Sequence, residues 1–262
     1  MTAELAHQRT RPPLMEHRAI ARPSAGRVIR TAFRTYRERF GRVAGTAFLV
    51  FGAIASIDAL AAILIVEHVS STTGDAIAST AAAVFSMAGV VIYAGVLDKV
   101  VGAHLHGERE LSISEIVHVL PLGRLVAADL LLAIATLAGL ILFVVPGIAI
   151  FTLLSLVGPM ITIEDRTVGS AFKRSSQLVR RRFWLTFVLV TLPLQVEQAV
   201  LHAINYTALF DHPVLPAFLL NGLLGTIVGS VVGLIEVVLA YELVAHNGER
   251  IRAPSDGVSR FQ

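Results

Sequence analysis

Six long apolar segments constrain the fold of this chain more than any other feature. A helix needs about 20 apolar residues to cross a hydrocarbon core of about 30 Å. Windows of roughly this length fall at 43–66, 76–95, 125–145, 148–163, 184–206 and 218–243. We therefore predict an all-α integral membrane bundle of six transmembrane helices within residues 24–246, with a disordered cytoplasmic tail at 1–23 and a second cytoplasmic tail at 247–262.

Composition agrees with a membrane location. The chain is 55% hydrophobic and only 16% charged, whereas a soluble domain is about 25% charged. The absence of cysteine excludes disulfides and thiolate metal sites.

The basic residues alternate between the connections. All 22 Lys and Arg residues lie in 1–42, 98–124, 164–183 and the C-terminal tail, and the connections around 67–75, 146–147 and 211–216 contain none. Because cytoplasmic loops carry an excess of Lys and Arg, this pattern predicts that both termini lie in the cytoplasm. It also explains the net charge of +3 without a nucleic-acid partner.

The fourth span is the shortest. Residues 148–163 cover only about 24 Å at the helical rise, so the alternative is one kinked helix over 125–163. That helix would move the six basic residues of 164–183 to the outside, against the charge rule. We expect two spans joined by a tight turn at Pro146-Gly147, with a kink at Gly158-Pro159.

A basic amphipathic helix is predicted at 24–40 and again, 143 residues later, at 167–183. In the first copy Ser24 is a candidate N-cap, and cationic residues occupy one face while apolar residues occupy another, namely Ile29, Phe33, Tyr36 and Phe40. A shorter third copy begins at Ser112 with the Ser-x-x-Glu pattern of a capping box and ends at Pro121. The pattern indicates three units, each an interfacial helix followed by a membrane hairpin, so that these cytoplasmic helices precede the odd-numbered spans.

Helices of this kind lie in the plane of the lipid headgroups. Each cation near an anionic surface contributes about 1 kcal/mol of binding. The plainer interpretation is that these residues orient and anchor the protein. The more specific one is that they bind membrane lipids of anionic type, or a protein partner, through Arg27, Arg30, Arg34, Arg37, Lys173, Arg174, Arg180 and Arg181.

Several different short motifs lie in the second half of the chain, near its start and near its end. They are Gly158-Pro159, Glu164, Ala171-Phe172-Lys173-Arg174-Ser175, Leu178-Val179-Arg180, Phe183-Trp184, Phe33-Arg34-Thr35-Tyr36-Arg37 with Phe40, and Tyr241-Glu242-Leu243. With these motifs the chain resembles, over roughly 24–245, the six-span membrane domain fused to some bacterial glycerophosphodiester phosphodiesterases and its stand-alone relatives. The resemblance implies a multi-pass protein of the bacterial inner (cytoplasmic) membrane. It does not imply phosphodiesterase activity, because that chemistry belongs to a separate barrel domain for which this chain has no room.

Four acidic residues fall inside the apolar windows: Asp58, Asp129, Glu197 and Glu236. Acids within a span are costly and usually face the bundle interior or a wet cavity. Glu236 has the strongest case, because it continues a stripe of small residues that permits close helix packing, formed by Gly225, Gly229 and Gly233.

The other three acids have different settings. Asp58 lies on a similar packing face nearer the outer leaflet. Asp129 is expected near the inner interface, snorkelling or paired with Arg124. Glu197 lies in a polar stretch after Pro193, which is compatible with a helix on the outer surface. For each acid, structural packing, protonation or hydrogen bonding is the plainer role, and a transport or substrate site is the alternative.

No catalytic or metal-binding motif is present. His104-Leu105-His106, with the nearby Glu108, Glu110 and His118, lacks a known ligand spacing. The phosphate-binding Gly-rich loop, the His-Glu-x-x-His motif and the Gly-x-Ser-x-Gly motif are also absent. We therefore expect that the protein binds no metal and no cofactor and has no enzymatic activity.

Two functions remain open from the sequence. The first is a non-enzymatic envelope or lipid-associated factor, or the membrane subunit of an assembly. The alternative is a transporter or channel that uses Glu236 and Asp58. A bundle with filled packing would favour the first function, and an acid-lined cavity between the repeats would favour the second.

Overall fold

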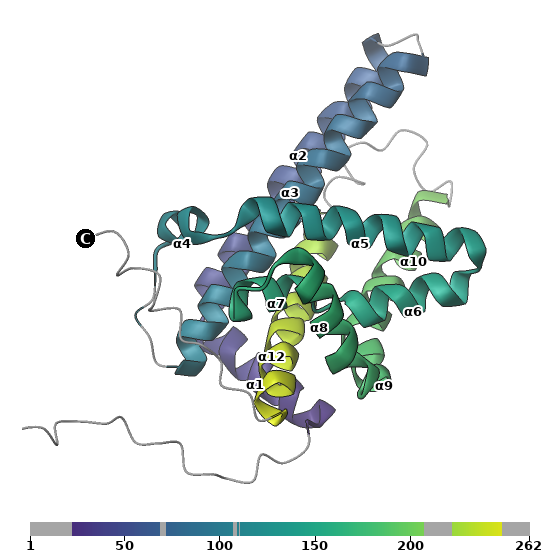
Figure 1. Ribbon diagram of the computed structural model, residues 1–262. Helices are drawn as coiled ribbons and strands as arrows, with labels where there is room; N and C mark the ends of the chain where they lie inside the picture. Colours follow the sequence, from purple (N-terminus) through teal and green to yellow (C-terminus); the bar gives the residue numbers. More distant parts are fainter. Residues whose placement is uncertain (1–22, 69–71, 107–108, 110, 207–221, 248–262) are drawn as a thin grey trace, which may run out of the picture.

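The computed structural model describes residues 23–68, 72–106, 109, 111–206 and 222–247, and these ranges contain helices and no strand (Figure 1). The two predicted tails therefore lie almost entirely outside the described residues. The helices, including two π-helical segments η1 and η2, are α1 (Ala25–Glu38), α2 (Phe40–His68), α3 (Thr72–His106), α4 (Ile113–Val119), α5 (Leu122–Leu142), α6 (Val144–Leu154), α7 (Val157–Glu164), α8 (Val168–Arg180), α9 (Phe183–Thr186), η1 (Phe187–Thr191), α10 (Leu192–Tyr206), η2 (Gly225–Gly229) and α12 (Ser230–His246).

Six segments of these helices are long and apolar enough to cross a membrane, which confirms the all-α membrane bundle. They are Phe40–Ile57, Phe85–Leu105, Leu122–Leu142, Val144–Glu164, Phe183–Val200 and Gly222–His246.

The second span differs most from its prediction. We predicted 76–95, with Asp98 and Lys99 in a connection, but α3 continues to His106 and its apolar segment is Phe85–Leu105. The helix continues through Asp98 because this residue is buried and accepts a hydrogen bond from Thr162 on α7. Asp98 therefore lies inside the second span, and not at its end as predicted.

Helices α5 and α6 form the predicted hairpin, but the turn lies at the extended residue Phe143, and Pro146 and Gly147 belong to the first turns of α6. A Cβ on Gly139 would lie 2.8 Å from the Cα of Gly147, whereas residues eight apart in one helix are separated by about 12 Å. The alternative of one kinked helix over 125–163 is therefore wrong. Helices α6 and α7 together form the fourth span, and they are separated at Ser155 and Leu156, a few residues before the predicted kink at Gly158-Pro159. Pro159 has no N–H to donate to the Ser155 carbonyl, which explains a break at that point.

The chain is built from three units, α1–α3, α4–α7 and α8–α12, and each begins with a short helix before a pair of spans. Ser24, Ser112 and Thr167 occupy the N-cap positions of α1, α4 and α8. Ser112 also forms the predicted capping box, in which its N–H donates to Glu115 at 2.7 Å and its hydroxyl accepts from the Glu115 N–H at 3.2 Å. These bonds hold the pKa of Glu115 below its ordinary value.

The first and third units match residue by residue. Helices α1 and α8 begin at 25 and 168, and the following helices begin at 40 and 183, so both pairs are 143 residues apart. The buried positions match as well, since Val28, Ala32 and Thr35 of α1 correspond to Ala171, Ser175 and Leu178 of α8. Of the expected apolar face of α1, Ile29, Phe33 and Phe40 are 47%, 68% and 56% exposed and so do not pack within the bundle.

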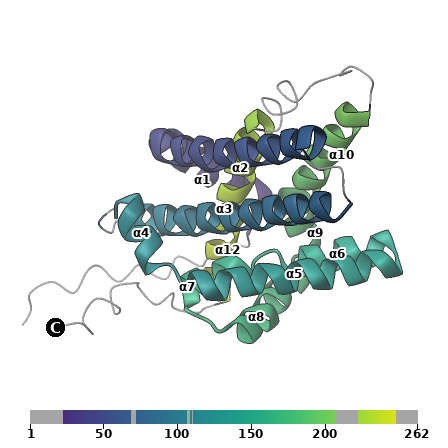
Figure 2. The same cartoon turned by 90° about the horizontal axis from the view of Figure 1, so that it is seen from above.

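The three units close into a ring. Helix α4 packs on α3, α8 packs on α7, and α1 packs on α12, so each short helix covers the second span of the preceding unit and the first unit closes on the third. The second spans contact one another through α3, α7 and α12. Figure 2 shows α2, α3 and α5 side by side, with α4 at one end of α3. Because each unit contains two spans, the chain returns to the same end of the bundle before every short helix.

Candidate functional site

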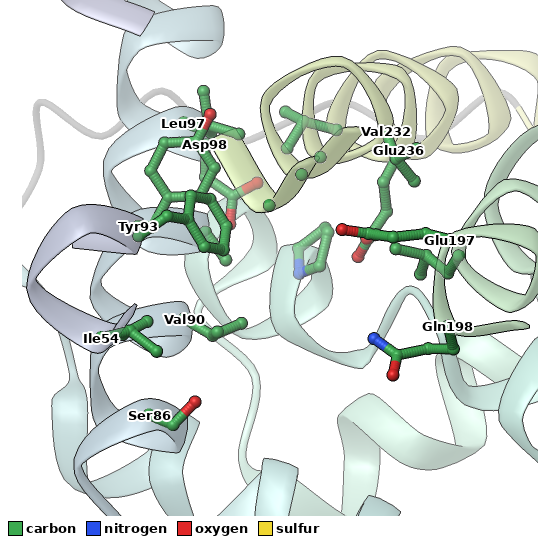
Figure 3. A pocket seen from close by; sticks show the side chains of 18 residues that line it. Ile54, Ser86, Val90, Tyr93, Leu97, Asp98, Glu197, Gln198, Val232 and Glu236 are labelled. Atoms are coloured by element: carbon green, nitrogen blue, oxygen red, sulfur yellow. The ribbon is translucent and has the colours of Figure 1, made fainter. Parts of the chain in front are cut away.

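A cavity of about 360 Å³ lies between the second spans and their neighbours. Its walls come from α2, α3, α7, α10, η2 and α12, and are largely apolar (Figure 3). The polar side chains that line it are Ser86, Tyr93, Asp98, Glu197, Gln198 and Glu236.

The cavity lies deep within the membrane-spanning segments. Asp98 is eight residues from the end of α3 and Glu236 is ten from the end of α12, which corresponds to depths of about 12 Å and about 15 Å. Carboxylates at this depth are costly unless they have partners or face a wet cavity. Three carboxylates in one cavity therefore need a physical explanation.

Asp98 is held by one known contact. The Thr162 hydroxyl, on α7, donates to Asp98 Oδ2. The other oxygen, Oδ1, is buried without a hydrogen-bond partner among the residues that the structure describes. The side chain is 3% exposed, so Asp98 offers an unused acceptor beside the cavity.

Sequence reasoning placed Asp98 in a loop and therefore missed it. The available signal was the apolar pattern that continues past it through Val100 and Val101, without a proline.

Tyr93 supplies a second unused polar group. Its ring packs edge to face against Phe51, with 5.2 Å between the ring centroids. Its hydroxyl is buried and has no hydrogen-bond partner within the described ranges. Buried polar groups are nearly always hydrogen-bonded, so the Tyr93 hydroxyl and Asp98 Oδ1 are two polar atoms at the cavity that are available to a bound solute.

Positions 93 and 236 correspond to each other through the 143-residue repeat, and so do 98 and 241. Tyrosine and acid thus exchange places, because α3 carries Tyr93 and Asp98 whereas α12 carries Glu236 and Tyr241. The surrounding burial agrees, since Leu97 and Val101 of α3 are buried like the matching residues of α12, Ala240 and Val244. The two helices therefore present the same two residue types to the bundle interior in opposite order.

Glu197 and Glu236 reach into the same part of the cavity from α10 and α12 (Figure 3). The polar stretch around Glu197 does not form a separate helix on the outer surface. Instead, α10 continues the fifth span and brings Glu197 and Gln198 to the cavity. A π-helical segment directly precedes each of these two helices: η1 leads into α10, and η2 leads into α12. Such segments often occur at functional sites.

The glycine stripe permits the close approach of the helices around the cavity. A Cβ on Gly229 would lie 2.6 Å from the Phe51 ring, and one on Gly225 would lie 3.2 Å from it. A Cβ on Gly233 would lie 2.8 Å from Leu97. The stripe therefore faces α2 and α3, and this packing directs Glu236 inward.

The other predicted acids lie elsewhere. Asp129 on α5 is half-buried and within electrostatic range of Glu236. Its expected partner Arg124 instead donates to Asp165, at 2.7 Å, and to the Arg166 carbonyl. Asp58 belongs to α2, but its side chain lies outside the described residues.

The predicted basic residues separate into two groups. Most are exposed on α1 or at the α8 end, namely Arg27, Arg30, Arg34, Arg37, Lys173, Arg180 and Arg181. Arg174 differs, because its side chain is 11% exposed and pairs with Glu164 at 3.3 Å. Arg174 therefore joins α8 to α7 and is less accessible to lipid than its neighbours on α8.

The histidine stretch has a structural partner. His104 Nε2 lies 3.3 Å from a carboxylate oxygen of Glu38, which joins α3 to α1. Glu108 and Glu110 lie outside the described residues. Among the residues that are described, no group of three metal-binding side chains converges closely enough to hold a metal ion.

No protein-family model matches this sequence, and no curated protein or solved structure shows significant similarity to it. The resemblance to the six-span domain of phosphodiesterases therefore stays a prediction.

Proposed function

We propose that this multi-pass membrane protein is a transporter that binds a small organic cation inside the bilayer. The observation that carries the proposal is the cavity of about 360 Å³ lined by Asp98, Glu197 and Glu236, with the unused Tyr93 hydroxyl beside it. Substrate sites at the interface between structural repeats, at mid-membrane depth, are typical of transporters. The proposal keeps Glu236 from the sequence-based alternative, but Asp98 takes the place of Asp58 and Glu197 is added.

The electrostatics favour a positive charge. Asp98 and Asp129 lie within electrostatic range of Glu236, and like charges in a low-dielectric interior repel strongly. A cation between Asp98 and Glu236 reduces that repulsion and occupies the unused acceptor of Asp98.

The size and walls of the cavity favour an organic cation. Ligand cavities of about 300–1,000 Å³ are typical of small-molecule sites. Here the apolar part of a solute would contact Phe51, Val90 and Val232, while its ammonium group would meet the carboxylates. Binding of this kind needs no chemical step.

A second candidate function is lipid association through α1. Its exposed Ile29, Phe33 and Phe40 lie beside exposed arginines, which suits a helix in the headgroup layer. This function is compatible with transport, and it is the lipid-associated role expected from the sequence.

We also propose that both termini face the cytoplasm of a bacterial inner membrane, on the basis of the distribution of Lys and Arg. Because the chain has no cysteine, single cysteines report cleanly on topology. In intact cells, an impermeant maleimide is expected to label Val145→Cys, at the exposed α5–α6 turn, and not Lys173→Cys on α8. The reverse result would overturn the orientation.

Carbodiimide labelling tests the cation site. In proteoliposomes, dicyclohexylcarbodiimide is expected to modify Glu236, and ethidium is expected to slow the labelling and to be taken up. Glu236→Gln should abolish uptake and reduce labelling, since Asp98 and Glu197 remain in the cavity. The control Asp165→Asn, which changes an exposed acid at the end of α7 outside the cavity lining, should retain both. Absence of labelling, or ethidium uptake unchanged in Glu236→Gln, would contradict the proposal.

A further inference from the structure

A second cavity, of about 540 Å³, is lined by basic side chains in place of acidic ones. It is formed by the last turns of α8 and the end of α12, and its lining side chains are Arg174, Gln177, Leu178, Arg180, Arg181 and Asn247. Among the described residues, this lining includes three guanidinium groups and two amides but no carboxylate. The first cavity is lined by carboxylates, whereas this one is lined by guanidinium groups.

The floor of this cavity is fixed in place. Glu164 holds Arg174 at 3.3 Å, and both side chains are about nine-tenths buried, at 11% and 10% exposure. Leu178 is buried in the core and anchors the turn of α8 that carries the neighbouring Gln177. Because positions three and four apart share a helix face, Arg174, Gln177 and Arg181 are directed to one side.

On the α12 side of the cavity, a helix-terminal carbonyl group is already hydrogen-bonded. Asn247 is the C-cap of α12, and its amide donates to the Leu243 carbonyl at 2.8 Å. This bond satisfies one of the terminal carbonyls, whose partial negative charge would otherwise repel an anion. Glu164 pairs with both Arg166 and Arg174, and the cavity lining also carries the exposed positive charges of Arg180 and Arg181.

We infer that this cavity binds a phosphoryl group on the face that we propose is cytoplasmic. Guanidinium groups match phosphate oxygens through paired N–H donors, and the amide of Gln177 adds a further donor. The cavity is larger than a bare phosphate requires, which leaves space for the alcohol that a phosphoester carries. The phosphoryl group belongs either to a lipid headgroup or to a soluble phosphoester.

The first repeat lacks this site. Under the 143-residue relation, Arg174 corresponds to Thr31 and Arg181 to Glu38. On α1, Glu38 pairs with Arg34 at 3.5 Å and so neutralises part of its positive charge. Helix α1 therefore carries a diffuse basic surface and α8 carries a discrete site, which makes α1 a matched control.

Binding measurements on the full chain test the inference. We would titrate the purified protein in detergent with three probes: dihexanoyl phosphatidylglycerol, glycerol 3-phosphate and inorganic phosphate. The double variant Arg180→Gln/Arg181→Gln is expected to weaken binding of at least one probe tenfold or more. The control Arg30→Gln/Arg37→Gln, which removes the same charge from exposed positions of α1, is expected to change binding of the two soluble probes less than twofold. Because α1 is itself proposed to contact lipid, this control is expected to weaken binding of the lipid less than Arg180→Gln/Arg181→Gln does.

The probes distinguish the source of the phosphoryl group. Binding of the lipid alone identifies a headgroup, whereas binding of glycerol 3-phosphate or phosphate with the same arginine dependence identifies a soluble ligand; either result supports the site. Equal loss in both double variants indicates general electrostatic attraction and overturns the inference, as does the absence of binding by all three probes. This test does not depend on the acidic cavity, because ethidium uptake measures that site separately.

Discussion

The acidic cavity and the basic cavity differ in depth, and the difference teaches where this protein can tolerate charge. Asp98 and Glu236 lie within spans, where an unpaired charge is costly, and Asp98 depends on Thr162 from another helix. Arg180 and Arg181 lie at a helix end and are exposed, so water stabilises them without a protein partner. Substitutions should therefore affect stability around the acidic cavity and beneath the basic cavity, and have little effect at the basic rim.

The largest expected effect is at the floor of the basic cavity. Glu164→Ala leaves Arg174 buried without its carboxylate partner, which costs about 3–5 kcal/mol for a buried pair. Thermal unfolding in detergent should show a clear loss of stability. Arg109→Ala removes an arginine whose pairing with Glu115 is largely exposed, and it should change stability little. Equal effects of the two variants would show that burial does not matter here.

A smaller loss is expected when the Asp98 contact is removed. Thr162→Val deletes the hydroxyl that donates to Asp98 and leaves a buried acceptor unsatisfied, at a cost of about 1–3 kcal/mol. The control is Thr136→Val, because the Thr136 hydroxyl is buried without a hydrogen-bond partner in the described part of the chain. If the control is as destabilising as Thr162→Val in chemical unfolding, the hydrogen bond has no special role.

Glu236→Gln should act in the opposite direction. It removes a carboxylate that lies within electrostatic range of two others, so we expect a gain in stability of about 1 kcal/mol together with loss of ethidium uptake. Unfolding and uptake measured on one preparation separate the two effects. A loss of stability would show that the charged form of Glu236 is already balanced in the empty protein.

The smallest effect is expected at the rim of the basic cavity. Without added phosphoester, Arg180→Gln/Arg181→Gln should change the free energy of unfolding by less than about 0.5 kcal/mol, as for other exposed positions. Thermal unfolding with and without dihexanoyl phosphatidylglycerol checks this. A large change without the lipid would assign these arginines to the fold and not to a binding site.

Several features of the fold were predictable because they depend on local pattern. Apolar stretches predicted six spans, and the spacing of basic and apolar residues predicted α1 and α8. Ser112 and Glu115 predicted the capping box of α4. The α5–α6 hairpin followed from the absence of charge between the two apolar segments, although its turn lies at Phe143 and not at the predicted Pro146-Gly147.

Other features depend on contacts between distant helices. Asp98 resembled the end of a span until Thr162 of α7 was found beside it, 64 residues away in sequence. Arg174 resembled its exposed neighbours, and only its contact with Glu164 distinguishes it. The relation between α3 and α12 was hidden because tyrosine and acid exchange places between Tyr93 and Glu236.

The sequence by itself determined six apolar segments long enough to cross a membrane and a short helix before each pair of spans, which is basic in the first and third units. Hydropathy and helical periodicity are local properties, so they can be read without a partner. Only the tertiary structure decided which acids share a cavity, which arginine is buried, and how the three units close into a ring. Those outcomes depend on the packing of α3, α7 and α12 against one another, and no single segment of the sequence encodes that packing.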